Sequence, residues 1–505
     1  MPPKDRQTRL GTRCAAVRHL TGGHAIISPR IASTGENPAG IVSWCYVWKI
    51  RCLHAWGPFL VSTLGHAPTA FEIAEARSAA LRKSTMRKVA LRLIPFLLLL
   101  YVCNLIDRNN VGFTKSAVQA DLGMTGAAYA FGAGLFYFGY LVFEVPSNLI
   151  LRRTGARVWI SRIVITWGLV SGATMLVNGF ASFFTVRILL GVAEAGFFPG
   201  IIYYLTSWFP LRERTRAVAG FMAANALGGI ITNPLSGVIM QYLDRVGGLH
   251  GWQWVFLLEC IPSVILGFCA LFYLTDRPDQ AHWLAADERA WLADRIGEEE
   301  KYRSTRHGTD FRRALVDPRV WFLVALYFTI AVGSNTAGLY MPELIRNRFP
   351  HANEVRVGLI AAVPSVCGLV AMLINGAWAD RTGKYRLHVG LPAVLSSLGW
   401  LLAAVTHSPA VGLVGLCLAM MGIMCTLPVF WSLPTSFLSG AAAAGGIALI
   451  NSLGNVGGLL GPGTVGLIHE HDTAGSYTWG LLALAATMFV GGILALFAPH
   501  DPAPS

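Results

Sequence analysis

The chain has 505 residues, of which 54% are hydrophobic and only 13% are charged, and its mean hydropathy is +0.52. A soluble protein normally carries about 25% charged residues, so this composition is too apolar for a large water-soluble globule and favours a membrane protein. The formal net charge of +13 does not indicate nucleic-acid binding, because residues 1–85 contribute eleven Lys or Arg against four Asp or Glu, and most other basic residues lie in short loops between apolar runs.

Residues 1–85 do not resemble a membrane domain. The segment 41–65 is apolar, but Lys49, Arg51 and His54 interrupt it, and an ionised side chain at the centre of a bilayer costs several kcal/mol. The order of basic region, apolar region and cleavage site that marks a signal peptide is not found there. We therefore expect residues 1–85 to be an extension outside the membrane domain, either disordered or translated from a start site upstream of the native one.

Twelve apolar segments follow the extension, and each is close to the roughly 20 residues that a membrane helix needs. They are expected at 89–112, 127–150, 159–178, 182–207, 216–242, 253–274, 319–342, 355–378, 388–406, 409–436, 443–468 and 477–498. The sequence therefore predicts an all-α membrane protein with twelve transmembrane helices in two six-helix bundles. The predicted divisions are an N-terminal bundle at 86–274, a central cytoplasmic loop at 275–318, a C-terminal bundle at 319–500 and a tail at 501–505.

Basic residues are concentrated in the loops on one side of the predicted membrane. They are Arg152, Arg153, Arg157, Arg212, Arg214, Arg216, Arg381, Lys384 and Arg386, together with those of the central loop. The loops at 178–181 and 469–476, on the opposite side, are neutral or acidic. Because cytoplasmic loops carry the excess of Lys and Arg, this pattern predicts a multi-pass protein of the bacterial inner (plasma) membrane with both termini in the cytoplasm.

The two halves of the chain share a local pattern. Residues 148–155 read NLILRRTG and residues 376–383 read GAWADRTG, each directly after the second span of its half. A repeated six-helix unit is typical of secondary transporters, in which two bundles move about a site between them. An enzyme is not indicated, since we find no nucleophile with a base, no CxxC or CxxxC pair among the nine cysteines and no metal-ligand cluster. We expect no cofactor and no metal.

Four charged residues inside apolar runs are candidates for function, because charges in a membrane are expensive. Asp107 and Arg108 lie in the first span, and Arg187 and Glu194 lie in the fourth, seven residues apart and so on one helix face. A guanidinium group matches a carboxylate substrate, and a carboxylate in a low dielectric can exchange protons near neutral pH. The four residues could therefore bind an anion and a proton, or they could form a buried ion pair that holds spans one and four together.

Other polar residues in the spans leave both a binding and a structural role open. Glu144 and Glu259 lie near a helix end or a polar neighbour, which favours a structural or interfacial role. Asn451 and Asn455 are four residues apart and share a face, so they could bind substrate or bond between helices. Further candidate ligands are Asn225, Asn233, Tyr137, Tyr140, Trp431 and Ser432, for which interhelical bonding or aromatic packing is the alternative.

A loop motif then connects the sequence to a known superfamily. Gly376, Asp380, Arg381, Gly383, Lys384 and Arg386 match G-x-x-x-D-R-x-G-[RK]-x-[RK], the loop signature of major facilitator superfamily transporters, which the chain therefore resembles. In the first half, Arg152 replaces the acidic residue of this motif. The resemblance implies that the six motif residues form a loop involved in conformational change.

Within that superfamily, the chain resembles the anion:cation symporter family, which includes tartrate, phthalate, glucarate, galactonate and hydroxyphenylacetate permeases. The matching stretches are 105–115, 191–200, 208–217, 276–279 and 448–458, and the resemblance covers about 75–500. In that family, the Asp-Arg pair of helix 1 and the Arg and Glu of helix 4 serve proton coupling and anion binding. The resemblance assigns these roles to Asp107, Arg108, Arg187 and Glu194, the helix-5 substrate contact to Asn225, and the helix-11 Asn to Asn451 or Asn455.

Together these observations predict proton-coupled import of a small organic anion by alternating access. Protonation of Asp107 and Glu194 is expected to favour loading, while Arg108 and Arg187 hold the carboxylate. The expected partners are the anion, protons and the lipid bilayer, with no nucleic acid, and the protein is expected to be a monomer. A proton-driven exporter of drugs or metabolites and an anion exchanger that needs no proton remain as alternatives.

Overall fold

The computed structural model describes residues 70–306, 316–437, 440–472 and 476–499. Most of the predicted extension, 1–85, lies outside the described residues. The chain divides into two units, Met1–Ala74 and Glu75–Ser505, and the second unit contains the features discussed below.

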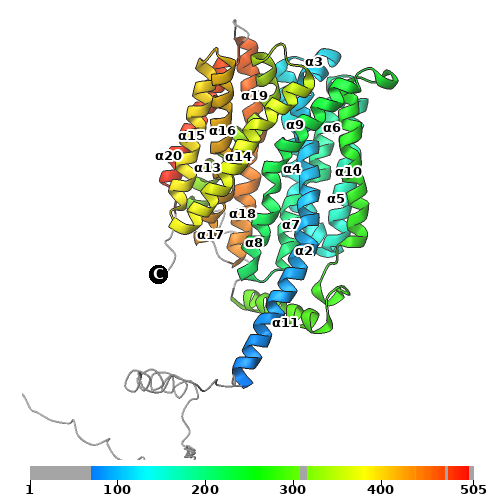
Figure 1. The fold of residues 1–505 in the computed structure, drawn as a ribbon, viewed down its shortest axis with the longest axis vertical. Helices are drawn as coiled ribbons and strands as arrows, with labels where there is room; N and C mark the ends of the chain where they lie inside the picture. Colours follow the sequence, from blue (N-terminus) through cyan, green and yellow to red (C-terminus); the bar gives the residue numbers. More distant parts are fainter. Residues whose placement is uncertain (1–69, 307–315, 438–439, 473–475, 500–505) are drawn as a thin grey trace, which may run out of the picture. The chain divides into compact units, whose positions relative to one another are not determined.

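Every regular element in the described part of the chain is a helix, which confirms the all-α prediction (Figure 1). The first half contains α2 (Ala70–Phe113), α3 (Lys115–Leu122), α4 (Gly126–Thr154), α5 (Ala156–Ala173), α6 (Phe180–Glu194), α7 (Phe197–Thr206), α8 (Leu211–Met222), α9 (Ala224–Tyr242), α10 (Gly251–Tyr273) and α11 (Ala286–Arg306). The second contains α13 (Pro318–Arg348), α14 (Glu354–Thr382), α15 (Tyr385–Val405), α16 (Pro409–Phe430), α17 (Ser432–Phe437), α18 (Gly440–Gly454), α19 (Val456–His471) and α20 (Thr478–Leu496). Short 3-10 turns lie at Thr174–Leu176, Val246–Gly248 and Pro278–Gln280.

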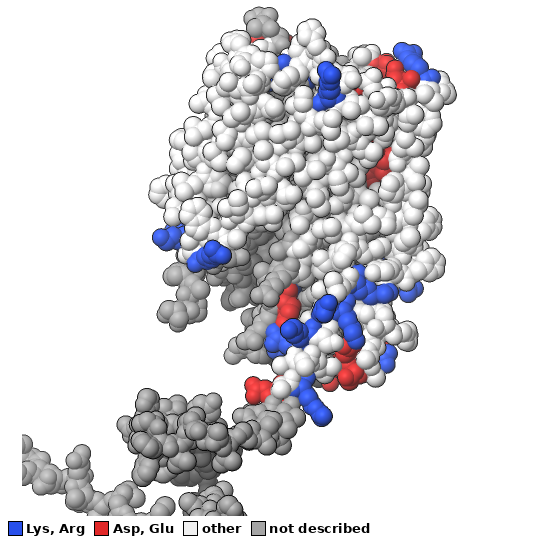
Figure 2. Space-filling view, in the orientation of Figure 1, with Lys and Arg blue, Asp and Glu red and all other residues white. Residues whose placement is uncertain are grey.

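These helices make twelve crossings, six in each half, as expected from the sequence. In the described residues, ten crossings are long and apolar enough to span a membrane by length and composition. The other two, α8–α9 and α18–α19, correspond to the predicted fifth and eleventh spans and are rich in Gly and Asn. Figure 2 agrees with a membrane location, because charged side chains gather at the two ends and a largely uncharged band lies between them.

The fourth and fifth crossings of each half are broken into two helices. The breaks separate α6 from α7, α8 from α9, α16 from α17 and α18 from α19. In the fourth crossing, Ala195 leaves the helical conformation and Gly196 has a φ of +86°, a left-handed conformation that favours glycine. In the eleventh crossing the break falls at Asn455, directly before α19, and the backbone there stays right-handed helical. The same crossings are interrupted in both halves, in keeping with the repeat that the sequence indicates.

Small residues allow neighbouring crossings of the first half to approach closely. A Cβ atom on Gly139 of α4 would overlap the backbone carbonyl of Ile188 on α6, and one on Gly191 of α6 would overlap that of Phe136 on α4. Helix pairs in membranes rely on such contacts because lipid supplies no hydrophobic drive for helix association. The close packing of α4 on α6 fixes the positions of the charged residues that α6 carries.

We call the end of the molecule where α3 lies the α3 face, and the opposite end, where α11 lies, the α11 face (Figure 1). At the α3 face the two halves are joined by polar contacts. Lys115 of α3 forms an ion pair with Glu343 of α13, and the hydroxyl of Tyr477 donates to Glu343 at 2.6 Å. The backbone N–H of Ala127 donates to Glu470 at 3.0 Å. Lys115–Glu343 and Ala127–Glu470 therefore bridge the two halves at the α3 face.

The central loop packs on the first half. Glu288 of α11 accepts from Ser84 at 2.7 Å and from Lys88 at 2.9 Å, both on α2, and Trp283 stacks on Trp208 with 5.4 Å between the ring centroids. The predicted boundary at residue 85 therefore falls inside a continuous helix, and residues on both sides of it contact α11.

Candidate functional site

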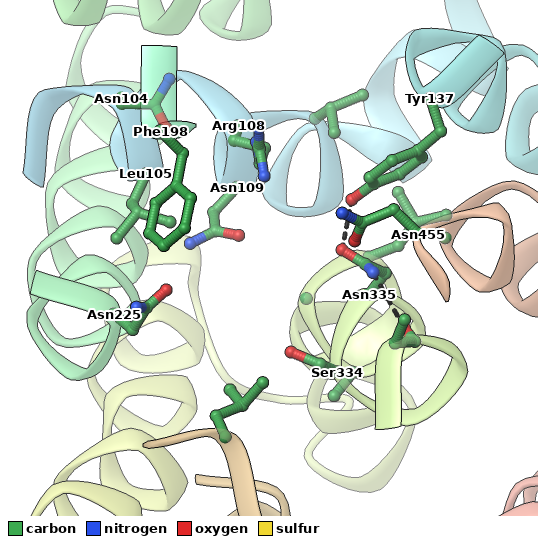
Figure 3. Close-up of a pocket in the computed structure, with 18 of the residues that line it drawn as sticks. Asn104, Leu105, Arg108, Asn109, Tyr137, Phe198, Asn225, Ser334, Asn335 and Asn455 are labelled. Atoms are coloured by element: carbon green, nitrogen blue, oxygen red, sulfur yellow. Dashed lines mark hydrogen bonds between the residues drawn. The ribbon is translucent and has the colours of Figure 1, made fainter. Parts of the chain in front are cut away.

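A central cavity of about 200 Å³ lies between the two halves (Figure 3). Its lining comes from α2, α4 and the broken fourth and fifth crossings of the first half, and from α13, α14 and the broken tenth and eleventh crossings of the second. Ten of the predicted coupling and ligand residues line it, namely Arg108, Tyr137, Tyr140, Arg187, Glu194, Asn225, Asn233, Trp431, Asn451 and Asn455. Residues far apart in the sequence thus meet at one place.

Arg108 and Glu194 form an ion pair across α2 and α6 at the cavity wall. The guanidinium of Arg108 also lies over the rings of Phe136, at 4.9 Å, and Tyr140, at 5.8 Å. The buried pair between spans one and four, one of the two alternatives left by the sequence, is therefore present. Because both partners line the cavity, the pair is also accessible to a ligand.

Arg187 lies on the same face of α6 as Glu194 and also lines the cavity, as the seven-residue spacing predicts. Arg187 is 3% exposed. Its guanidinium donates to the carbonyl oxygen of Ala133 at 3.1 Å and lies 5.3 Å from the centroid of the Phe136 ring. Within the described residues, no carboxylate lies within 4 Å of its guanidinium, and its Nε has no hydrogen-bond partner. A buried charge without a counter-charge is costly, so this cation is suited to an anionic ligand.

Asp107 neighbours Arg108 on α2 but faces away from the cavity, into the first bundle. Its carboxylate accepts from the indole of Trp167 at 3.0 Å, from Ser171 at 3.1 Å and from Ser263 at 2.5 Å. Asp107 is 2% exposed and is not among the residues that line the cavity. The two predicted proton-binding carboxylates therefore occupy different environments: Glu194 lies in the cavity beside a cation, and Asp107 lies behind it among neutral donors.

The remaining wall of the cavity combines amide and phenol groups with apolar side chains such as Leu105 and Phe198 (Figure 3). The hydroxyl of Tyr137 on α4 donates to Asn335 on α13 and so connects the two halves. Asn335 donates to the carbonyl of Ala331 at 2.9 Å. Asn225 accepts from the hydroxyl of Tyr101 at 3.1 Å, so this predicted ligand also has an intramolecular partner.

The tenth crossing supplies one of its two predicted ligands. Trp431 lies at the break between α16 and α17 and lines the cavity, with its ring 5.1 Å from that of Tyr327 and 5.2 Å from that of Phe430. Ser432 begins α17 and is not among the lining residues. The backbone at Trp431 keeps a right-handed helical conformation, and neighbouring residues on a helix are about 100° apart, so the two side chains point in different directions.

Several lining residues were not singled out from the sequence. They are Tyr101, Asn104, Asn109, Tyr327, Ser334 and Asn335. Asn104 and Asn109 belong to the same polar run as Asp107 and Arg108, and Asn335 is an amide within an otherwise apolar span, so polarity within a span is the signal that could have found them. Tyr101 and Tyr327 carry no such signal, because buried aromatic residues are common in any helix bundle.

The loop motif occupies the turn between α14 and α15. Gly376 lies within α14, Gly383 follows the end of that helix with a φ of +64°, and Lys384 precedes α15. The left-handed backbone at Gly383 explains why the motif requires glycine at this turn. In the first half the corresponding turn is capped differently, because the carboxylate of Asp276 accepts from the backbone N–H of Arg157 at 2.7 Å.

The described residues contain no group of three or more His, Cys, Asp or Glu side chains that could hold a metal ion. The six described cysteines, Cys103, Cys260, Cys269, Cys367, Cys417 and Cys425, are free. The polar groups of the cavity are therefore ionic and hydrogen-bonding: two guanidinium groups, one carboxylate, and several amides and phenols, set among apolar side chains.

Two repeated six-crossing halves around a charged central cavity define a membrane transporter. The family model described as Major Facilitator Superfamily matches residues 97–462, and the chain belongs to this superfamily. It is 45% identical over 416 residues to a candidate tartrate transporter of Agrobacterium vitis, covering 82% of this chain and 91% of that protein. It is 38% identical to a quinolone resistance transporter of Acinetobacter baumannii, covering 82% and 94%.

Among solved structures, the fold is similar to the xylose transporter XylE from E. coli in a partially occluded inward-open conformation. The TM-score is 0.67 at 14% identity, and the match covers 83% of this chain and 100% of that one. This similarity supports the fold. The predicted resemblance to organic-anion transporters of the major facilitator superfamily is confirmed by the family match and the closer relatives.

Proposed function

We propose that the protein is a proton-coupled symporter that imports a small organic anion, with a carboxylate bound at Arg108 and Arg187. The observation that carries this proposal is Arg187, a buried cation at the cavity wall for which the described residues provide no paired carboxylate. Its planar guanidinium can bind both oxygens of a carboxylate at once. An anionic substrate would supply the charge that this side of the cavity lacks.

The pair between Arg108 and Glu194 suggests how proton and substrate are coupled. While Glu194 is ionised, it occupies the guanidinium of Arg108. Protonation of Glu194 removes this competitor, so that a substrate carboxylate can bind Arg108 and Arg187 together. One proton and one negative charge then enter the site, and its net charge does not change. Loading both is therefore favoured over loading either alone, which is the requirement for symport.

Asp107 is the second proton-binding residue of the proposal. Three neutral donors surround its carboxylate, and the described residues place no Lys or Arg within 4 Å of it. It can therefore gain or lose a proton without breaking an ion pair. Since it adjoins Arg108 on α2 but faces the bundle interior, its charge would act on the first bundle and not on the substrate directly.

We assign the α11 face to the cytoplasm. The basic residues of the central loop and of the turn at Arg381 and Lys384 lie in the loops of this side, which is the pattern of cytoplasmic loops. The contacts at the α3 face would then close the periplasmic side, so that the substrate exchanges with the cytoplasm in this state. The relative from Agrobacterium vitis favours a hydroxylated carboxylate as the substrate.

Uptake into vesicles under an imposed pH gradient tests the proposal. Purified protein in lipid vesicles is supplied with labelled L-tartrate, phthalate or a sugar acid, with the outer solution more acidic than the lumen. Accumulation of at least one carboxylate above its outer concentration, and its abolition by a protonophore, are expected. Equal uptake with and without the gradient, together with rapid counterflow, would instead identify an anion exchanger.

A second candidate is proton-driven export of an aromatic carboxylate. It is favoured by the aromatic residues in the cavity wall, including Tyr137, Phe198 and Trp431, and by the quinolone resistance transporter among the relatives. The charged cavity argues against a broad pocket for uncharged drugs. The direction of the gradient decides: an exporter would move substrate toward the acidic compartment, and the symporter would move it away from that compartment.

A further inference from the structure

Glu144 is a buried carboxylate that connects the two halves next to the cavity. It lies on α4 and is 3% exposed. One oxygen accepts from the amide Nδ2 of Asn451 at 3.0 Å, and the other accepts from the hydroxyl of Ser452 at 2.5 Å, both on α18. No ion pair within 4 Å involves Glu144 in the described part of the chain. Its two partners are therefore neutral donors of the opposite half.

The position of Glu144 puts it outside the cavity but in contact with its wall. It is not among the lining residues, whereas Asn451 and Asn455 are. It lies two helical turns from Tyr137, toward the α11 face. Glu144 therefore contacts Asn451, a wall residue of the eleventh crossing, without lining the cavity itself.

A carboxylate fixes the orientation of the amide that it binds. Both oxygens of Glu144 accept hydrogen bonds, so Asn451 presents its NH₂ group to Glu144 and turns its carbonyl oxygen the other way. That carbonyl oxygen accepts from the Nδ2 of Asn455 at 3.2 Å. Asn455 is then oriented in turn, with its nitrogen toward Asn451. Among the described residues, its own Oδ1 has no hydrogen-bond partner.

This chain of hydrogen bonds gives the cavity two chemically different walls. The first half presents the guanidinium groups of Arg108 and Arg187, which bind a carboxylate. The second half presents the amide oxygen of Asn455, which accepts from a donor such as a hydroxyl group. If Glu144 did not fix the amides, Asn451 and Asn455 could rotate, and this wall would offer a donor as readily as an acceptor.

We propose that Glu144 is a specificity-determining positioning residue that acts through Asn451 and Asn455 to make the cavity select carboxylates that bear a hydroxyl group. The inference rests on the proposed function, because it assumes a carboxylate substrate. It goes further in assigning the selection of the hydroxyl to a residue that does not touch the substrate.

L-tartrate and succinate form a matched pair of probes, because both are four-carbon dicarboxylates and only tartrate has hydroxyl groups. In vesicles, we expect the wild-type protein to prefer tartrate in kcat/KM by at least about tenfold, since a site built to bind a hydroxyl group leaves its own polar atom unpaired with the analogue. In Glu144→Gln, whose amide can either donate or accept, the preference should fall to within about threefold of unity.

Ser452→Ala is the matched control. It removes one hydrogen bond of Glu144 but leaves the bond that orients Asn451, and Ser452 does not line the cavity. The tartrate preference should therefore stay at the wild-type value in this variant. A purely structural role for Glu144 would instead reduce the rates for both substrates equally in Glu144→Gln.

The inference is overturned by an unchanged ratio in Glu144→Gln, or by a wild-type protein that does not prefer tartrate to succinate. The second result would leave the proposed function standing if a pH gradient still drove uptake of another carboxylate. Failure of all gradient-driven uptake would instead contradict the proposed function. The role of Glu144 could then still be tested by comparing the tartrate preference of the wild type and Glu144→Gln in counterflow.

Discussion

Replacement of Glu194 by Gln should separate anion binding from proton coupling. Gln keeps the size of the side chain and mimics the protonated carboxyl group, so Arg108 loses its charged partner at every pH. We expect Glu194→Gln to bind the anion with an affinity that no longer depends on pH, and to support counterflow between equal pools. Uphill uptake driven by a pH gradient should be lost.

The magnitude follows from the coupling. A gradient of one pH unit supplies about 1.4 kcal/mol per proton, so a wild-type symporter that moves one proton with each anion accumulates its substrate up to about tenfold, apart from any membrane potential. With Glu194→Gln, the ratio of inner to outer concentration should stay near one. The assay is uptake of a labelled carboxylate into vesicles, with counterflow at equal pH on both sides as the control for folded, active protein.

Arg187→Lys provides the contrasting variant on the same helix face. It keeps the positive charge but loses the planar fork, so binding should weaken by about 1–3 kcal/mol at every pH, the usual scale of a hydrogen bond to a charged group. Accumulation under a gradient should survive at saturating substrate. Gradient-driven accumulation by Glu194→Gln at the wild-type level would remove Glu194 from the mechanism and leave Asp107 as the remaining candidate. Loss of folded protein in both variants, with unchanged pH dependence of the residual transport, would support a purely structural role.

Three further predictions concern topology and the two faces. A reporter that is active only in the periplasm should be silent when fused after Ser304 and active after Asn353; activity at Ser304 would reverse the assigned orientation. Gly383→Ala should destabilise the protein by about 1 kcal/mol in thermal unfolding, because the backbone there is left-handed. Gly376→Ala is the control and should not destabilise it, because Gly376 lies within α14 and has room for a Cβ atom. Lys115→Gln should leave Glu343 without its cation and favour opening at the α3 face. The measurement is faster labelling, by a membrane-impermeant thiol reagent added from that side, of a cysteine introduced at Ser334 in the cavity wall; neutralising Glu343 as well should reverse the effect.

The crossings and the charged residues of the cavity could be predicted from the sequence because each depends on a local signal. Hydropathy locates an apolar run, and the seven-residue spacing of Arg187 and Glu194 alone places them on one face of a helix. The loop motif at Gly383 is likewise local, since one left-handed residue ends a helix there. These features do not require knowledge of which helices are neighbours.

The direction of a side chain in the bundle could not be predicted in the same way. Asp107 and Arg108 are adjacent in the sequence and were expected to act together, yet one faces the first bundle and the other faces the cavity. About 100° of rotation separates neighbouring residues on a helix, so the result depends on how α2 is rotated against its neighbours. The hydrogen bond between Glu144 and Asn451 is still harder to predict from sequence, because it requires knowing how the two halves pack against each other.

The packing of the central loop on the first half has a consequence for the way in which the two halves can move. Because α11 is bound to α2 through Glu288, and Trp283 is stacked on Trp208, we expect this part of the central loop to move with the first bundle if the two halves tilt against each other. A rotation of the first bundle would then carry α11 along as part of the same body, so α11 would not act as a hinge between the halves.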